Sequence, residues 1–331
     1  MPALCVIPGD GIGHEVIPAA VRVLQAVIPD LQLVEAEAGW ACFEQYGVSV
    51  PQETLEKIRA CGAALFGAVS SPSRKVEGYR SAILTMRQAL ELYANLRPVR
   101  SLPHISPAQG IDFVVVRENT EGMYAQREHR DGDTAIAERV ITRAASERIG
   151  RVALELANSR ARKKMTIVHK ANILPVTDGL FRDTVREAAA VFPDVQVDEL
   201  LVDIACLKVV SEPSRYDVIV TTNLFGDILS DVASYWAGGM GYAPSVNIGR
   251  DAVLAEPVHG SAPDIAGQGI ANPIAAILSA ALLARYAWQN EHAVGRMEQV
   301  VSTFLERSGQ DVLAGTMGTQ AITDGVMAVL E

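Results

Sequence analysis

Two spacings of apolar residues recur along the chain and predict strands that alternate with helices. Short, continuous apolar runs are typical of buried strands. They fall at residues 3–7, 31–36, 63–68, 112–117, 164–169, 195–202 and 216–222. Apolar residues three and four positions apart predict amphipathic helices. These lie at residues 14–27, 51–60, 81–93, 146–159, 178–190, 203–210, 271–288 and 292–307. The alternation indicates an α/β fold with a parallel sheet covered by helices.

Two segments depart from this pattern. Residues 127–141 predict an irregular or β-rich excursion. Residues 240–270 are rich in Gly and Pro, so we expect a loop platform without long elements there.

The composition allows a large core and excludes several classes of protein. The 331 residues are 49% hydrophobic, which is enough for two lobes, and the net charge of −10 disfavours binding to nucleic acids or membranes. The longest apolar run, 274–284, is too short to span a bilayer. The four cysteines lack CxxC spacing and a preceding secretion signal, so we expect reduced thiols in a cytoplasmic protein.

Two carboxylates stand four residues apart in the segment 223–231. A helix that begins near residue 224 would place Asp227 and Asp231 on one face, where like charges repel. A hard divalent cation between them would turn that repulsion into binding. The alternative is a solvated helix whose N-terminal carboxylates are favoured by the helix dipole.

Five basic or phenolic residues lie near the ends of predicted strands or helices. Arg87, Arg97 and Arg117 could each hold a carboxylate through two hydrogen bonds, which suits a small polycarboxylate. Lys170 ends a strand and could act as a base, and Tyr124 could donate a proton. The alternatives are surface salt bridges, a solvated lysine and a packed tyrosine.

A glycine-rich turn at residues 8–13 follows the first strand. Its spacing is GxGxG, which departs from the GxGxxG of dinucleotide-binding turns, and it lacks the GK[ST] ending of a phosphate-binding loop. We therefore expect a tight turn that brings the backbone close to a ligand.

Together, six segments in chain order give the sequence a close resemblance to the β-decarboxylating dehydrogenases, which include isocitrate, 3-isopropylmalate and homoisocitrate dehydrogenases. The matching segments are residues 9–15, 93–98, 117–122, 169–172, 223–231 and 256–267. The resemblance implies two α/β domains, a cofactor site that is not of the Rossmann type, and an active site in the cleft between the domains. The large, cofactor-binding domain would combine residues 1–98 with 238–331, and the small domain would be residues 99–237.

The resemblance also implies roles for individual residues. The three arginines and Asn172 would bind substrate, and Ser71 would touch both substrate and nicotinamide. Mg²⁺ or Mn²⁺ would be held by Asp227, Asp231 and Asp203. Since Lys170 and Asp203 would serve the other subunit's site, we expect a homodimer, or two dimers paired into a tetramer, with residues 125–145 in the subunit contact.

The segment 256–267 resembles the adenosine loop of the family. The residues expected to bind the cofactor are His259, Gly260, Ser261, Ala262, Asp264 and Asn272. A carboxylate at Asp264 would accept hydrogen bonds from both ribose hydroxyls and repel a 2′-phosphate. NADP-dependent relatives carry Lys-Tyr at positions 264–265, so the resemblance implies NAD.

The substrate is expected to be homoisocitrate, with isocitrate as a side activity. Residues 71–78 are similar to bacterial homoisocitrate dehydrogenases. Those enzymes often carry an arginine where this chain has Leu84, and Leu84 suits the isopropyl group of 3-isopropylmalate, which is the second candidate. Arg80 lies seven residues before Arg87 and could supply the cation if the helix extends that far. A non-catalytic regulatory subunit is the remaining alternative, although this chain keeps the lysine, the tyrosine and the three aspartates.

Overall fold

The computed structural model describes residues 1–72, 74 and 76–330, and the described chain forms eleven α-helices and twelve strands. Ser73 and Lys75, which belong to the segment similar to homoisocitrate dehydrogenases, lie outside the described residues. The chain divides into two compact units. Unit 1 comprises Met1–Leu92, Ser101–Gln109 and Ala237–Glu331, and unit 2 comprises Tyr93–Arg100 and Gly110–Trp236. The domain boundaries expected from the sequence stay a prediction.

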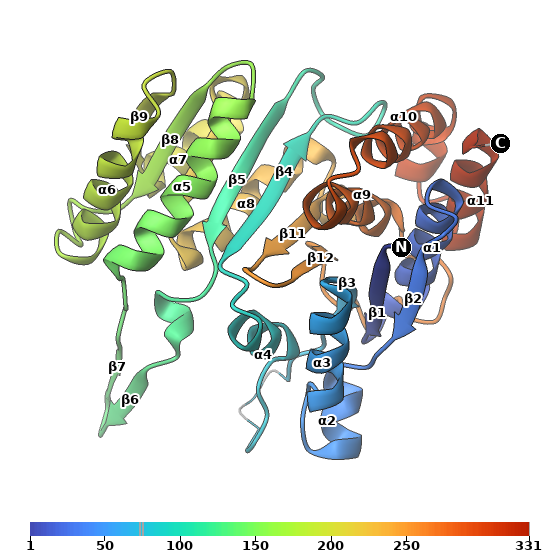
Figure 1. The fold of residues 1–331 in the computed structure, drawn as a ribbon, viewed down its shortest axis with the longest axis horizontal. Helices are drawn as coiled ribbons and strands as arrows, with labels where there is room; N and C mark the ends of the chain where they lie inside the picture. Colours follow the sequence, from blue (N-terminus) through green and yellow to red (C-terminus); the bar gives the residue numbers. More distant parts are fainter. Residues whose placement is uncertain (73, 75, 331) are drawn as a thin grey trace. The chain divides into compact units, whose positions relative to one another are not determined.

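Unit 1 has five strands in the order β2-β1-β3-β12-β11 (Figure 1). The pairs β2·β1, β1·β3 and β3·β12 are parallel, and β11·β12 is an antiparallel hairpin. The strands are β1 (Ala3–Gly9), β2 (Gln32–Glu35), β3 (Ala63–Ala68), β11 (Pro244–Ile248) and β12 (Val253–Pro257). The hairpin lies in residues 240–270, where the sequence predicts no long element, and each of its two strands has five residues.

Helices pack against both faces of the unit 1 strands. The sequence predicts most of them, but not α2 or α11. They are α1 (Gly13–Val27), α2 (Trp40–Tyr46), α3 (Gln52–Cys61), α4 (Ala82–Ala89), α9 (Ile274–Trp288), α10 (Glu291–Leu313) and α11 (Thr319–Leu330). Alternate side chains of β1, Cys5 and Ile7, pack with α3 and α4 in one buried cluster, while α1, α9, α10 and α11 pack with one another. Burial raises the pKa of the free Cys5 thiol to about 12.

Unit 2 contains the remaining main strands, in the order β4-β5-β10-β8-β9. They are β4 (Ala94–Arg100), β5 (Asp112–Glu118), β8 (Lys164–His169), β9 (Gln196–Leu201) and β10 (Val218–Thr221). All pairs are parallel except β4·β5. Because parallel strands end at the same edge, the ends of β5 and β10 lie side by side, with Arg117 paired to Thr221.

Helices of unit 2 cover its strands on two faces. They are α5 (Arg143–Ser159), α6 (Thr177–Ala188), α7 (Val202–Ser211) and α8 (Asn223–Ser234). α5 and α6 pack together, whereas α7 and α8 share a buried cluster with Phe113, Val115 and Ile219. The predicted β-rich excursion is confirmed as an exposed hairpin of β6 (Glu128–Asp131) and β7 (Thr134–Ala137). Among the described helices, none is both long and apolar enough to cross a bilayer.

Candidate functional site

The acidic pair lies on α8, which follows β10 directly, and neither carboxylate is in the first turn of the helix. Asp227 and Asp231 lie one turn apart on this helix, as their spacing predicts. Asp231 also lies on the outer face of α8, because its side chain is 50% exposed. Burial raises the pKa of Asp231, the neighbouring charge of Asp227 raises it further, and Arg97 opposes both. Two repelling carboxylates of this kind offer the hard oxygen ligands that Mg²⁺ and Mn²⁺ prefer, so the donor set fits a divalent cation.

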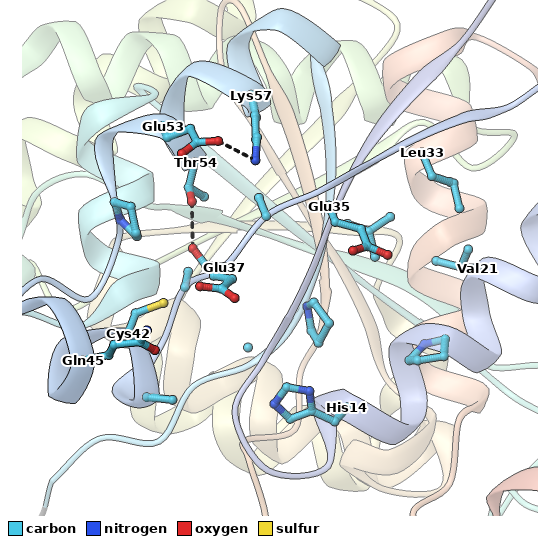
Figure 2. A pocket seen from close by; sticks show the side chains of 18 of the residues that line it. His14, Val21, Leu33, Glu35, Glu37, Cys42, Gln45, Glu53, Thr54 and Lys57 are labelled. Carbon is cyan, nitrogen blue, oxygen red and sulfur yellow. Dashed lines mark hydrogen bonds and ion pairs between the residues drawn. The ribbon is translucent and has the colours of Figure 1, made fainter.

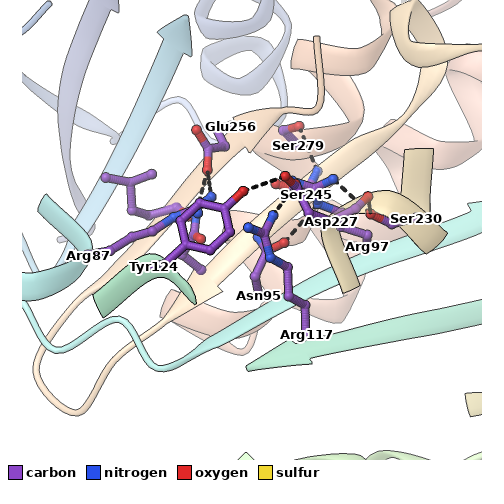
Figure 3. A network of polar contacts seen from close by, with 12 residues as sticks. Arg87, Asn95, Arg97, Arg117, Tyr124, Asp227, Ser230, Ser245, Glu256 and Ser279 are labelled. Carbon is purple, nitrogen blue, oxygen red and sulfur yellow. Dashed lines mark hydrogen bonds and ion pairs between the residues drawn. The ribbon is translucent and has the colours of Figure 1, made fainter. Parts of the chain in front are cut away.

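Two of the predicted arginines converge on these carboxylates. Arg97 reaches from the antiparallel strand β4 and donates to Asp227 Oδ1 at 3.3 Å (Figure 3). It also donates to Asp231 Oδ1 at 3.0 Å. Arg117 ends β5 and also donates to Asp227. Its guanidinium is 1% exposed and is fixed by Asn223 Oδ1 at 2.8 Å and 3.0 Å. Because Arg97 and Arg117 are buried, the alternative of surface salt bridges is excluded for these two arginines.

Gly226 allows Arg117 to reach this position. A Cβ atom at Gly226 would lie 2.6 Å from Arg117 Cγ, so any larger residue would displace the arginine side chain. The glycine of the 223–231 segment is therefore required by the close passage of Arg117 beneath the first turn of α8.

Tyr124 completes this cluster from the short 3₁₀ helix Met123–Ala125. Its hydroxyl donates to Asp227 Oδ2 at 2.6 Å, and its ring lies 5.1 Å from the Arg117 guanidinium carbon (Figure 3). Burial raises the pKa of Tyr124, and the hydrogen bond to Asp227 raises it further. The phenol is thus held in its protonated form, as a proton donor requires.

Lys170 and Asp203 form a separate pair in unit 2. The Lys170 ammonium donates to Asp203 Oδ1 at 2.5 Å. This hydrogen bond is the main cause that lowers the pKa of Asp203. Within the described chain, no three His, Cys, Asp or Glu side chains come together as a cation site. Asp203 is therefore not brought to Asp227 and Asp231 within one chain. Asn172 lies exposed in the loop after Lys170.

The third predicted arginine lies in unit 1. Arg87 is 5% exposed on α4 and donates to Glu256 Oε1 of β12 at 3.1 Å (Figure 3). Glu256 is held in turn by the Asn247 side-chain amide at 2.8 Å. For Arg80 to share a helical face with Arg87, the helix would have to extend as far as Arg80. It does not, because α4 begins at Ala82. Arg80 instead donates to Gln88 at 2.9 Å, and Leu84 is half-buried on α4.

The expected cofactor loop is fixed by the glycine-rich turn at residues 8–13. Ile12 N donates to Ser261 O at 2.9 Å, and a Cβ atom at Gly11 would lie 2.1 Å from that oxygen. Gly11 also has a φ of +55°. The close approach expected for this turn is thus to the backbone of the loop 259–264, and the space beside Gly11 that a Rossmann-type phosphate would need is taken by Ser261.

Two carboxylates hold the same region, Asp10 within the turn and Glu15 in the first turn of α1, and neither was predicted from the sequence as a site residue. Asp10 is 6% exposed and accepts backbone hydrogen bonds from Trp40, Ala41 and Ser70 at 2.8–3.2 Å. The Ser70 hydroxyl, next to the predicted Ser71, donates to Ser261 Oγ at 2.8 Å. Glu15 accepts from Gly267 N at 2.7 Å, at the far end of the loop. The signal available in the sequence was Asp10 itself, a carboxylate between two glycines that can accept hydrogen bonds from nearby backbone N–H groups.

The loop itself has donors and acceptors that fit a nucleotide. The His259 Nε2 atom is buried and makes no hydrogen bond among the described residues, and burial lowers the pKa of His259. Asp264 is exposed, Gly260 is exposed, and Ala262 has a φ of +38°. Asn272 accepts from Ile274 N at 3.0 Å at the start of α9. His259 Nδ1 lies 3.0 Å from Gly260 O, so Nε2 is the ring nitrogen left without a partner among the described residues. A neutral imidazole with one available nitrogen and an exposed carboxylate in the same loop suit an uncharged base and a ribose diol.

A groove of about 1080 Å³ lies elsewhere in unit 1, between α1, β2, α2 and α3 (Figure 2). Its polar lining includes His14, Glu35, Glu37 and Lys57, and the Lys57 ammonium is paired with Glu53 at 2.8 Å. None of the site residues predicted from the sequence line this groove. We therefore assign it no part in the chemistry.

Comparison with known proteins places this arrangement in a class. The isocitrate/isopropylmalate dehydrogenase family model matches residues 3–326, and the chain belongs to that family. The family and its solved structures indicate an oxidoreductase of the β-decarboxylating dehydrogenase type.

Individual relatives span the range of substrates. The chain is 55% identical to the isocitrate/homoisocitrate dehydrogenase of Thermus thermophilus, over 99% of this chain and 98% of the relative. It is 44% identical to the 3-isopropylmalate dehydrogenase of Archaeoglobus fulgidus over the whole of both chains. The crystal structure of isocitrate dehydrogenase from Methylococcus capsulatus superposes with a TM-score of 0.95 at 42% identity, covering 100% of this chain and 99% of that one.

Proposed function

We propose that this protein catalyses the NAD-dependent, metal-dependent oxidative decarboxylation of homoisocitrate to 2-oxoadipate, a step of lysine biosynthesis through 2-aminoadipate, and accepts isocitrate as a side substrate. The observation that carries the proposal is the cluster in which Arg97, Arg117 and Tyr124 surround Asp227. The name of the Thermus thermophilus relative supports the choice of substrate.

The cluster of unit 2 has the parts that such a reaction needs. Arg97 and Arg117 bind substrate carboxylates, and their present partner, Asp227, would hold Mg²⁺ or Mn²⁺ together with Asp231. When bound there, a divalent cation would supply Lewis-acid chemistry. Tyr124, kept protonated by burial, returns a proton to carbon after the loss of CO₂.

Lys170 is the proposed base that takes the hydroxyl proton, and Asp203 is its partner and the third cation ligand. Within one chain this pair is not joined to Asp227, which supports a site shared between two subunits. Arg87 and Asn172 bind substrate, and Ser71 contacts both substrate and nicotinamide. Their placement in a cleft between domains stays a prediction.

A homodimer is supported by the outer surface of α7 and α8. Ile204, Leu207 and Val210 are 39%, 64% and 46% exposed on α7, and on α8 Ile228 is 50% exposed three residues before Asp231. Apolar stripes of this kind mark protein interfaces, and this one carries a proposed ligand residue. Leu207→Glu should give monomers in sedimentation experiments and no NADH formation, whereas Val191→Glu, at a 66% exposed site outside these helices, should leave dimers intact.

The choice of NAD rests on the exposed carboxylate of Asp264. Asp264→Asn removes the charge that repels a 2′-phosphate, so the preference for NAD over NADP should fall by about tenfold or more. Asp251→Asn, at an exposed aspartate of another loop, is the control and should leave the preference unchanged. An unaltered ratio of kcat/KM values in Asp264→Asn would remove this role.

The substrate is tested by comparing kcat/KM for homoisocitrate, isocitrate and 3-isopropylmalate, with NAD and Mg²⁺. We expect homoisocitrate to lead. Arg80→Ala should lower kcat/KM for homoisocitrate far more than for 3-isopropylmalate, and Gln88→Ala, which only frees the Arg80 side chain, should not. Equal losses on both substrates would exclude Arg80 from substrate selection.

The second candidate is 3-isopropylmalate, because the half-buried Leu84 of α4 offers an apolar contact. A lead for 3-isopropylmalate in the same assay would make this candidate correct. A regulatory subunit would bind substrate and metal without forming NADH, so a flat absorbance trace with all three substrates would favour that alternative.

A further inference from the structure

We propose that Arg139 and Asp178 form a positioning pair that ties the Lys170 loop to the first turn of α8. Neither side chain is assigned to substrate, cofactor or cation. The inference rests on the proposed function in one respect, namely that Lys170 and Asp227 are the residues whose placement matters. The contacts themselves lie entirely within unit 2.

Asp178 fixes the loop that follows β8. Its carboxylate is completely buried in the first turn of α6, and Oδ2 accepts a hydrogen bond from the backbone N–H of Lys170 at 2.6 Å. The backbone N–H of Asp178 donates to Leu174 O at 3.0 Å. One residue thus holds both ends of a loop whose middle, including Val176, is exposed.

Arg139 connects this carboxylate to α8. Its Nη2 atom donates to Asp178 Oδ1 at 2.7 Å and to Thr222 Oγ1 at 2.9 Å. Thr222 is the N-cap residue of α8, but its side chain makes no capping bond, so the hydroxyl oxygen is used by Arg139 instead. The guanidinium carbon also lies 4.5 Å from the centre of the Phe225 ring in the same turn.

The contacts of Arg139 with α8 end next to the acidic pair. Thr222 O accepts from Gly226 N at 2.8 Å, and Asp227 is the following residue. A shift of this turn would move the Asp227 carboxylate relative to Arg117 and Tyr124, which both contact it.

The same arginine lies beside the segment that carries Tyr124. Val140 O accepts from Gly122 N at 2.8 Å, and Gly122 immediately precedes the 3₁₀ helix of Tyr124. The three segments that bear Lys170, Tyr124 and Asp227 therefore meet at one buried ion pair and its neighbour. We infer that the pair positions the proton donor and the cation ligand of one site together with the base that the same chain supplies to the partner's site.

Arginine has a specific reason to occupy position 139. A planar guanidinium can bond a carboxylate and a hydroxyl while it stacks on a ring, and a lysine ammonium offers no such plane. Arg139→Lys keeps the charge beside the buried Asp178, so the chain should fold while the link to α8 loosens. Arg148→Lys is the matched control, because Arg148 also bonds a threonine hydroxyl, at 3.4 Å, and stacks 4.3 Å from an aromatic ring, that of Tyr93, but contacts neither Lys170 nor α8.

The test compares wild type, Arg139→Lys and Arg148→Lys by two measurements. The first is hydrogen–deuterium exchange of the peptides that cover residues 168–176 and 222–230, which requires no activity. The second is kcat, KM and the Mn²⁺ dissociation constant. In Arg139→Lys we expect faster exchange in both peptides, a fall in kcat of about tenfold or more, and weaker Mn²⁺ binding, with the KM for NAD unchanged. Arg148→Lys should change none of these.

Thr222→Val separates the two halves of the link, because it removes only the oxygen on α8 that Arg139 binds. It should speed exchange in residues 222–230 and weaken Mn²⁺ binding, and leave exchange in residues 168–176 unchanged. Unchanged exchange in both peptides of Arg139→Lys would overturn the proposal, as would a lower melting temperature with unchanged kcat. Wild-type protein that forms no NADH would refute the proposed function alone. Hydrogen–deuterium exchange and Mn²⁺ binding would still test whether Arg139 and Asp178 position the two segments.

Discussion

The acidic cluster of unit 2 and the expected cofactor loop of unit 1 are held in place by different kinds of contact. Around Asp227, side chains contact side chains, with Arg97, Arg117 and Tyr124 meeting one carboxylate. The loop at 259–264 is held through its backbone, as in the bond from Ile12 N to Ser261 O. Substitutions in the cluster should therefore change chemistry at constant fold, whereas those at the loop should change stability and cofactor binding together.

The largest effect is expected for Asp227→Asn in the cluster. The variant removes the charge that faces Arg97 and Arg117, and it removes a proposed cation ligand. Mutation of a residue that only hydrogen-bonds a metal ligand lowers metal affinity or activity by about 10–100-fold. Loss of a ligand itself should therefore lower kcat/KM by more than about 100-fold. Circular dichroism should show an intact fold. Activity within tenfold of wild type would show that the cation is held elsewhere.

Gly11→Ala, which affects the expected cofactor loop of unit 1, should have the next largest effect. Its Cβ atom would meet Ser261 O, and its φ of +55° is unfavourable for alanine. The KM for NAD should rise and the free energy of unfolding should fall by more than the ~1–2 kcal/mol of left-handed strain alone. Gly47→Ala is the control, because Gly47 has a φ of +74° with no atom within 4 Å of a Cβ. Equal destabilisation in urea titrations would mean that the contact with Ser261 contributes nothing.

Asp10→Ala should destabilise unit 1 by about 1–3 kcal/mol, because it leaves backbone N–H groups without their acceptor. The substitution also frees the Ser70 backbone, so the KM for NAD should rise with it. Asp251→Ala, at an exposed site, should lie within about 0.5 kcal/mol of wild type. Calorimetric melting that cannot distinguish the two variants would contradict the structural role of Asp10.

The smallest effect is a pH dependence in unit 2. Burial lowers the pKa of His169 from 6.5, and the nearby charge of Glu199 opposes this only partly. Its Nδ1 accepts from Ala171 N at 3.1 Å, which requires the neutral ring. Below about pH 6.5 the unfolded chain binds a proton that the folded chain does not, so stability should be lost as the pH falls towards the folded pKa.

His169→Gln removes this titration. The difference in melting temperature between wild type and His169→Gln should therefore shrink as the pH is lowered from 8 to 5. A difference that is constant over this range would show that the His169 pKa is the same in both states.

Apolar periodicity located the strands that are apolar throughout, such as β3, β5 and β8, and their placement is confirmed. It did not reveal β4, where Asn95, Arg97 and Pro98 interrupt the apolar pattern. Those polar groups are buried because they meet partners from elsewhere, as Arg97 does with Ser230 at 2.8 Å. A strand whose polar side chains are satisfied by distant residues gives no periodic signal.

By itself the sequence determined the alternating elements, the carboxylate pair at i and i+4 on α8, and the family, because these depend on local spacing and on segments read in order. Only the tertiary structure decided which groups meet. Arg97 and Asp231 are separated by 134 residues, and Asp178 reaches Thr222 only through Arg139. The parallel order β5-β10-β8 brings these strand ends to one edge of the sheet, and this ordering is set by packing rather than by any local pattern.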